Sequence, residues 1–364
     1  MRYAGGIHPY EDMTTRSSMT LDPAPRKPAK PLVTVRDVAT HAGVSRATVS
    51  YTFTQPDRVS PDLRRRVLAA ADELGYVGND AARRLRVGHS LALGLLVSSV
   101  SNPVYAEIAA GAEAEAAAHG RFVLVANSDE SRQRERAYLR FFESQQVSGI
   151  LAIPVAGVPA ELTALRRRGT PFVLVGIAEG RHTYPAISGD NERGGHLATS
   201  HLLAQGRRRL LFVGGPHPHV DLRLAGAKRA IAESSAPASL EVIRVEVQTA
   251  KVGEAVARTL AGRSGPSLPD GIFAGNDLLA LGLLHGLITA GTRVPDDLSL
   301  VGYDDIEFAD FAIVPLTTIR HPSAALGASA VRILLGLEKE KDTEGRFDPE
   351  LVVRASSLPG TGRK

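Results

Sequence analysis

The sequence contains no cysteine and no tryptophan among its 364 residues, and aromatic residues make up only 5% of it. Without cysteine, the chain has neither a disulfide framework nor a thiolate metal site, which fits a reducing cytoplasm. Long hydrophobic runs are also missing. Stretches such as LALGLLV at 91–97 fall far short of the roughly 20 apolar residues that a membrane helix needs. We therefore expect a cytoplasmic protein with no membrane partner.

The N-terminal quarter of the chain differs from the rest in composition and charge. Residues 1–32 are rich in Pro, Arg and Ser and lack the apolar core of a signal peptide, so we interpret them as a disordered leader, with Met13 and Met19 as alternative starts. Residues 1–90 hold 14 Lys/Arg and 9 Asp/Glu, whereas the remainder holds 29 and 30. A basic head on a neutral body indicates a polyanionic partner, although so modest a surplus also fits an ordinary charged surface.

Residues 33–79 have the pattern of three short helices around one small core. Thr34 and Ser45 are good caps for the first two helices, and Gly43 stops the first. Ser60 and Pro61 are suited to begin the third helix, which Gly75 ends. Two short helices joined by a tight turn containing glycine predict a helix-turn-helix domain.

The second of these helices is the predicted DNA-reading element, because it enters the major groove in a helix-turn-helix. Arg46 offers a bidentate fork for guanine, Ala47 is small enough to touch a thymine methyl, and Tyr51 lies one turn further on the same face. The alternative is a solvated polar helix. Residues suited to phosphate contacts, or placed at the helix starts, complete the predicted DNA-binding set of this domain: Thr34, Ser45, Thr48, Ser50 and Ser60.

Residues 91–357 alternate apolar strands with helical stretches, which is typical of parallel sheets covered on both faces. We expect eight buried strands, within 91–97, 121–127, 149–155, 171–177, 209–215, 241–247, 271–275 and 298–304. Helices are expected at 104–118, 191–205 and 276–290, among others. This pattern predicts an α/β body of two doubly wound subdomains, followed by a tail at 358–364. Ligands bind such sheets at the carboxyl ends of the strands.

Polar residues at these strand ends are the candidates for a ligand cleft, because Arg, Asn and Asp can each pair two hydroxyls of a polyhydroxylated ligand. Asn276 and Asp304 follow predicted strands, and Arg223 is expected to open a helix. Asp190 is either a ligand residue or only a helix cap. Asn102, Tyr105 and His219 are weaker candidates.

Other patterns carry little chemistry. The HPH at 217–219 lacks a carboxylate cluster nearby in sequence, so a solvated loop is favoured over a metal site. The glycine pair at 214–215 has no following Lys-Ser/Thr, which a phosphate loop requires. No Ser-His-Asp set or nucleophile elbow stands out. We therefore predict that the protein is not an enzyme and that it has no catalytic residue, bound metal or cofactor.

The motifs DVATHAGVSRATVS, RVSPDLRRRV and ELGY, followed in order by GDNERGGHLATSHLL, AGNDLLALG, LVGYDDIEFA and PLTTIRHP, resemble the lactose-repressor (LacI/GalR) family over residues 33–357. The resemblance implies a bacterial transcriptional repressor with a helix-turn-helix headpiece and a two-lobed body like a periplasmic binding protein. By position, Arg46, Ala47 and Tyr51 match its base-reading residues, and Arg223, Asn276 and Asp304 match its effector-binding residues. Tyr51 departs from the Arg found in many members, and Thr54 from the usual Asn.

The resemblance also implies that residues 80–90 form a hinge helix on operator DNA, with Leu85 as the minor-groove wedge. Asn79 and Ala82 join Leu85 in the predicted DNA-binding set. No leucine heptads follow residue 357, so we expect a homodimer on a palindromic double-stranded operator. The expected effector is a sugar or sugar derivative, and a nucleobase or sugar phosphate is the alternative. A transporter's solute-binding protein and a sugar-modifying enzyme are the rival functions, but the headpiece and the lack of a catalytic set disfavour them.

Overall fold

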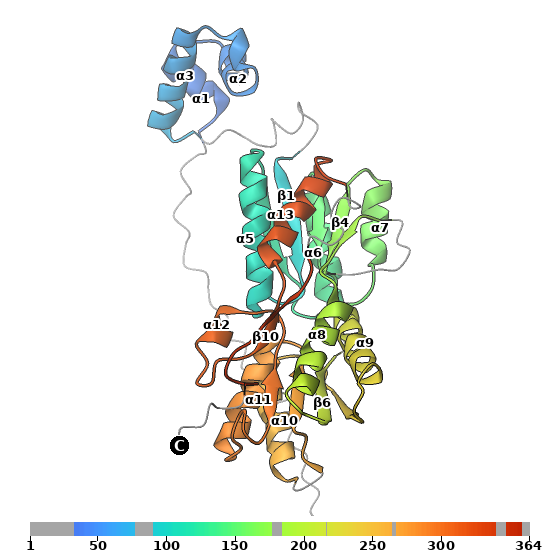
Figure 1. Cartoon of the computed structure of the whole chain (residues 1–364). Coiled ribbons are helices and arrows are strands. Elements are labelled where there is room, and N and C mark those ends of the chain that lie inside the picture. Colours follow the sequence, from blue (N-terminus) through green and yellow to red (C-terminus); the bar gives the residue numbers. More distant parts are fainter. Residues whose placement is uncertain are drawn as a thin grey trace, which may run out of the picture. The chain divides into compact units, whose positions relative to one another are not determined.

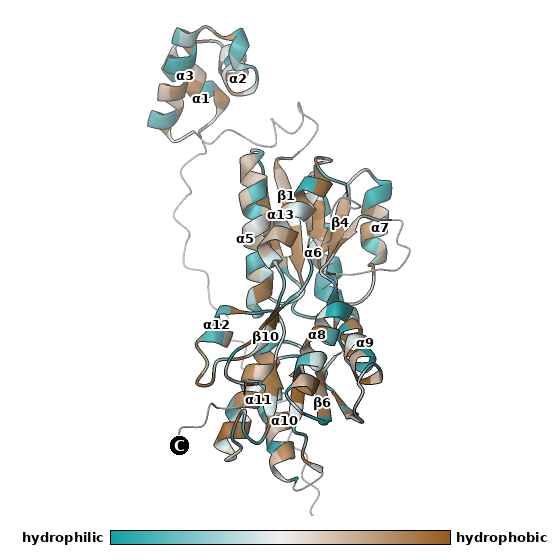
Figure 2. Cartoon of the chain, in the orientation of Figure 1, coloured by the Kyte–Doolittle hydropathy of each residue, from teal (hydrophilic) through white to brown (hydrophobic). Residues whose placement is uncertain are grey.

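The computed structural model describes residues 33–76, 90–176, 184–215, 217–263, 267–339 and 347–358. The chain divides into two compact units, Met1–Val87 and Gly88–Lys364, which we call the head and the body. Among the described residues, no helix is long and apolar enough to cross a membrane. Figure 2 shows hydrophobic residues gathered on the strands of the body and hydrophilic residues on the outer faces of its helices.

The head is a bundle of three helices, α1 (Val35–Ala42), α2 (Arg46–Thr54) and α3 (Pro61–Leu74), with a 3-10 turn η1 (Pro56–Arg58) before α3. Thr34 and Asp37 form a complete capping box at the start of α1, and Gly43 ends α1 in the left-handed conformation. Val38, Val49 and Val67, one from each helix, are fully buried against one another in the core. The predicted three-helix arrangement is confirmed.

The first lobe of the body is a five-stranded parallel sheet in the order β2-β1-β3-β4-β5 (Figure 1). The connections from β1 to β2, from β2 to β3 and from β3 to β4 each carry a helix that covers one face of the sheet. The strands are β1 (Ala92–Val97), β2 (Phe122–Asn127), β3 (Ile150–Ala152), β4 (Phe172–Val175) and β5 (Ala186–Ile187). The helices are α5 (Pro103–Ala118), α6 (Arg132–Ser144), α7 (Ala160–Arg167) and, from late in the chain, α13 (Ser323–Leu334).

The second lobe repeats this plan with a four-stranded parallel sheet in the order β7-β6-β8-β9. Its strands are β6 (Arg209–Gly214), β7 (Ser239–Arg244), β8 (Gly271–Ala274) and β9 (Ser299–Val301). Its helices are α8 (Asn191–Ala204), α9 (Pro218–Ala232), α10 (Ala250–Ala261), α11 (Asp277–Thr289) and the short α12 (Glu307–Asp310). Two antiparallel strands, β10 (Thr318–Arg320) and β11 (Glu350–Val352), lie beside α8.

All eight predicted strands are present, but two of them are not buried. β2 and β7 each lie at one edge of their sheets, with β5 and β9 at the other edges, and Phe122 and Val125 of β2 are 68% and 51% exposed. An outer strand has a neighbour on one side only, which apolar composition alone does not reveal.

Reciprocal glycines bring three pairs of helices together, α5 with α13, α8 with α9, and α10 with α11. A Cβ on Gly195 of α8 would lie 1.9 Å from the carbonyl oxygen of Arg223 in α9, and one on Gly226 of α9 would lie 1.9 Å from that of Glu192 in α8. The other pairs repeat this geometry with glycines at 253 and 282, and at 111 and 327. The helix backbones therefore touch directly, which no larger residue permits.

We predict that Gly195→Ala destabilises the body by about 1–3 kcal/mol, because the added methyl overlaps the α9 backbone. Urea unfolding followed by circular dichroism measures the change. Gly262→Ala is the matched control, since the nearest atom to a Cβ there is 3.8 Å away. Equal stability of the two variants would contradict the close approach.

Candidate functional site

The exposed start of α2 presents the residues predicted to read DNA. The Ser45 side chain caps the helix by accepting from Thr48 N at 3.0 Å, and the Ser45 and Thr48 hydroxyls lie 2.9 Å apart. Arg46 and Ala47 are exposed, and Tyr51 is 37% exposed one turn later. Val49 is fully buried in the core of the head, and this packing of α2 fixes the direction in which Arg46 projects.

The remaining predicted DNA-contact residues divide into three groups. Thr34 and Asp37 hydrogen-bond each other, and Ser50 accepts from the Thr54 hydroxyl through its carbonyl. Ser60 stands at the start of α3 without a side-chain cap hydrogen bond, contrary to its expected capping role, and its side chain is exposed. The hinge residues Asn79, Ala82 and Leu85 lie outside the described residues.

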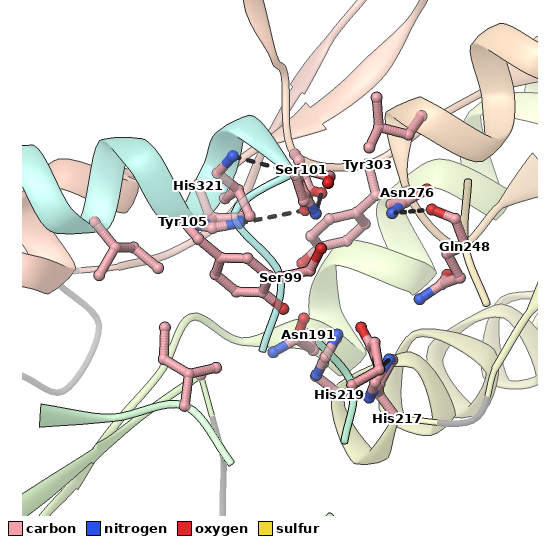
Figure 3. Close-up of a pocket in the computed structure, with 18 of the residues that line it drawn as sticks. Ser99, Ser101, Tyr105, Asn191, His217, His219, Gln248, Asn276, Tyr303 and His321 are labelled. Carbon is pink, nitrogen blue, oxygen red and sulfur yellow. Dashed lines mark hydrogen bonds and ion pairs between the residues drawn. The ribbon is translucent and has the colours of Figure 1, made fainter. Parts of the chain in front are cut away.

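A cavity of about 320 Å³ lies between the two lobes of the body, at the carboxyl ends of the strands. Figure 3 shows its lining side chains converging from both lobes and from His321, which lies between β10 and α13. Six of the seven predicted effector residues line it: Asn102, Tyr105, His219, Arg223, Asn276 and Asp304. Asp190 is not among the lining residues. It caps α8 by accepting from Arg193 N at 2.8 Å.

Arg223 is the most heavily constrained side chain of the cavity. Its guanidinium is buried and donates to Asn191 Oδ1 at 2.9 Å, to Gly275 O and to Asp304 Oδ1 at 3.5 Å. The same guanidinium lies 3.4 Å from the ring centre of Tyr303, a cation–π contact. The expectation that Arg223 opens its helix is wrong, because α9 begins at Pro218, which suits the first helical position.

The carboxylate of Asp304, in the second lobe, contacts side chains from both lobes and from the segment between β10 and α13. Besides Arg223, it lies 3.5 Å from His321 Nε2, and its Oδ2 accepts from Asn102 Nδ2 of the first lobe at 3.4 Å. Its backbone φ of 112° is rare for a residue other than glycine, and such strain persists where surrounding contacts hold it. Asn276 is likewise engaged, because its side chain caps α11 and donates to Gln248 O.

Several lining residues were not predicted as ligand residues: Glu130, His217, Gln248, Tyr303 and His321. The expectation of a solvated loop at the HPH motif is wrong, because the His217 side chain is 8% exposed and both His217 and His219 face the cavity. The Gln248 Oε1 atom is buried without a hydrogen-bond partner in the described structure. Position after a predicted strand is the one sequence signal that could have found Gln248.

Burial sets the protonation of three cavity side chains. It raises the pKa of Tyr105 and of Tyr303 to about 12, so both phenols stay protonated and can donate hydrogen bonds. Burial, and next the charge of Arg223, lower the pKa of His219 well below its usual value. A neutral His219 offers one donor and one acceptor to a ligand.

Asp277 lies directly behind the cavity and holds the Asp304 loop from both ends. Its backbone N donates to Tyr303 O at 2.8 Å, and its Oδ2 accepts from Ile306 N at 3.0 Å. Its Oδ1 accepts from the Thr318 hydroxyl at 2.7 Å, which ties the loop to β10. Burial, and next the charge of Asp304, raise the pKa of Asp277 well above its usual value.

Comparison with known proteins agrees with this two-unit design. Residues 34–79 match the model for bacterial regulatory proteins of the lacI family, and residues 199–357 match that for a periplasmic binding protein-like domain. The HTH-type transcriptional repressor PurR of Photobacterium profundum is 32% identical, with 89% of this chain and 98% of that protein covered. The chain belongs to the lacI family. It is therefore a DNA-binding transcriptional repressor and not an enzyme.

Two solved structures bear out the fold. The lac repressor dimer bound to operator and the anti-inducer ONPF superposes with a TM-score of 0.77 at 28% identity, covering 90% of this chain and all of that chain. The complex of the transcriptional regulator CelR with cellobiose gives a TM-score of 0.64 at 28% identity, covering 89% of this chain and all of that one.

We predict that Asp277→Asn flattens the dependence of stability on pH. The folded-state pKa of Asp277 is raised, so its contribution is fully present below 3.8, the pKa of an unperturbed Asp, and is lost as pH rises towards the folded value. An Asn side chain keeps an acceptor for Ile306 N and exchanges no proton.

Urea unfolding at about pH 4 and about pH 7 should therefore show a smaller loss of stability for the variant than for the natural chain. Asp296→Asn, at an exposed position of the same lobe, is the control. Parallel pH profiles for the natural chain and Asp277→Asn would refute the prediction.

Proposed function

We propose that this repressor binds a palindromic operator as a homodimer and responds to a sugar or sugar derivative in the cleft between its lobes. The observation that carries the proposal is the interlobe cavity, whose polar groups come from both lobes. We assign residues 33–79 to DNA binding, 80–90 to the hinge and 91–357 to effector binding and dimerisation, between a leader at 1–32 and a tail at 358–364.

The charges lining the cavity favour an uncharged, hydroxyl-bearing effector. Arg223 is paired with Asp304, His217 lies 3.1 Å from Glu130, and Asp129 accepts from Arg134 at 2.9 Å. No cation is left over among these for a phosphate. Gln248 adds an uncharged amide to the cavity lining, and its Oε1 is buried without a hydrogen-bond partner in the described structure. The cellobiose bound by CelR is a ligand of this kind.

Regulation follows from a shift in population between two arrangements of the lobes. One arrangement brings the two hinges of a dimer together on the operator, and the other separates them. An effector shifts this equilibrium only by its difference in affinity for the two states. We propose repression in the absence of effector and release in its presence. Since its target is the chromosome, we place the protein in the cytoplasm, at the nucleoid.

Two exposed apolar patches support the homodimer. One is on β2, at Phe122 and Val125, and the other is at α12, where Phe311 and Ile313 are 77% and 84% exposed. β2 lies at the edge of its sheet away from β4, so one of its sides is unpaired. Exposed apolar surface of this kind marks protein interfaces, and pairing it across a two-fold axis removes it from water.

The ligand class is tested by thermal shift with D-ribose, D-glucose, cellobiose, their phosphates and nucleosides. A ligand at about 100 times its Kd stabilises the native state by about 2.7 kcal/mol. We expect a free sugar to stabilise the natural chain and Gln248→Leu to lose most of that shift. Because Gln248 Oε1 has no protein partner in the described structure, Gln248→Leu without ligand should be at least as stable as the natural chain without ligand. Gln133→Leu, exposed on α6, is the control. A response to phosphates or nucleosides alone would overturn the sugar assignment.

We predict that Arg46→Ala weakens binding to a selected operator by about 1–3 kcal/mol and relaxes its base preference, because a bidentate base contact is lost. The operator is obtained by selection from random duplexes, and fluorescence anisotropy measures the affinity. Arg140→Ala, on exposed α6, removes the same charge from the body and should leave binding unchanged. Unchanged base preference in Arg46→Ala would exclude a base-reading role.

We predict that Phe311→Asp weakens dimerisation at least about tenfold, since it places a charge in the apolar α12 patch. Sedimentation velocity measures the dissociation. Leu337→Asp, which changes another exposed apolar residue outside both patches, is the control. A dimer as tight as that of the natural chain would exclude the α12 patch from the interface.

A further inference from the structure

We propose that Glu130 is a positioning residue for His219, and that it acts from across the cleft through His217. The consequence is that His219 is correctly presented to an effector only when the lobes are closed. The proposal rests on the proposed function of the cleft, and it adds a residue and a coupling to it.

The contact between Glu130 and His217 joins the two lobes. Glu130 belongs to the first lobe, between β2 and α6, and His217 belongs to the second, directly before α9. Glu130 Oε2 lies 3.1 Å from His217 Nε2, and the His217 side chain is almost fully buried there. Opening the cleft separates these two atoms.

The first lobe holds Glu130 in a fixed and unusual conformation. Asp129 and Glu130 have φ angles of 51° and 59°, in the left-handed region that favours glycine. Glu130 N donates to Ser98 O at 2.9 Å, and Arg134 holds the Asp129 carboxylate at 2.9 Å. The carboxylate is thus placed by its backbone rather than carried on a free loop.

His217 in turn supports His219. The two imidazole rings are parallel within 5°, with centroids 5.3 Å apart, and Figure 3 shows them side by side next to Asn191. No nitrogen of the His219 ring has a hydrogen-bond partner among the described residues, although the ring lines the cavity. The stack on His217 is therefore one restraint on the orientation of the His219 ring, and Glu130 contacts the ring on which His219 stacks.

A second polar contact across the cleft, Asn102 to Asp304, is longer at 3.4 Å and ends on a carboxylate that Arg223 also engages. Glu130 has no such competitor for His217 in the described structure. We therefore infer that the contact between Glu130 and His217 does more to hold the two lobes closed than the contact between Asn102 and Asp304. An effector that uses His219 binds the closed arrangement better and shifts the population towards it.

The lobe equilibrium is tested by spin-label distances in the full chain without ligand. The sequence has no cysteine, so Arg140→Cys on α6 and Lys228→Cys on α9 give one labelled pair in each protomer, one label on each lobe, and an excess of unlabelled chain dilutes the distances between protomers. We expect Glu130→Ala to broaden the distance distribution and move it away from that of the natural background. Glu130→Gln keeps an acceptor for His217 and should restore it. Glu143→Ala breaks an ion pair with Arg168 inside the first lobe and serves as the matched control.

The orientation of His219 is read from the imidazole resonances of histidine-labelled protein, in which His219→Ala identifies the signal. We expect Glu130→Ala, but not Glu143→Ala, to shift it. An unchanged distance distribution or an unchanged His219 signal in Glu130→Ala would overturn the proposal. Neither readout needs an effector, so the absence of any sugar response would count against the proposed ligand class alone.

Discussion

The second lobe depends on one buried guanidinium. Arg223 links α9 to the start of α8 through Asn191, to the end of β8 through Gly275, and to the loop after β9 through Asp304. Burying a cation costs far more than any single hydrogen bond returns, unless acceptors surround it. The polar ends of several strands therefore have to meet at this point, and the cleft forms where they meet.

The part of the site that follows the strands of one sheet could be predicted from the sequence, and the part that forms between the lobes could not. Apolar strands alternating with helices fix a parallel sheet, and the carboxyl ends of parallel strands share one edge, so Asn276 and Asp304 could be found from their positions alone. His217 and Glu130 could not, because they are 87 residues apart and meet only once the two lobes have folded. The exposure of β2 was missed for a related reason, since a strand's place in the sheet depends on partners elsewhere in the chain.

The two lobes place unusual backbone on opposite sides of one cavity. Asp129 and Glu130 in the first lobe, and Asp304 and Asp305 in the second, all have positive φ without being glycine. Each is held by hydrogen bonds from rigid elements, such as Asp304 N to Ile319 O at 2.8 Å. The side chains of Asp129, Glu130 and Asp304 line the cavity from backbone that cannot relax freely, which limits how they respond to a ligand and favours movement of whole lobes instead.

The glycine contacts between paired helices allow many side chains of the cleft to change without changing how the helices pack. Where α8 meets α9, and α10 meets α11, the closest atoms belong to the backbone and are the same for every amino acid. Arg223 lies at one of these crossings, but other side chains that face the cavity, such as those of His217 and Gln248, sit on loops beyond them. A lineage can exchange a histidine or a glutamine at the cleft for another residue and acquire a new effector while the lobes keep their packing. One scaffold can therefore be reassigned to different signals through a few substitutions.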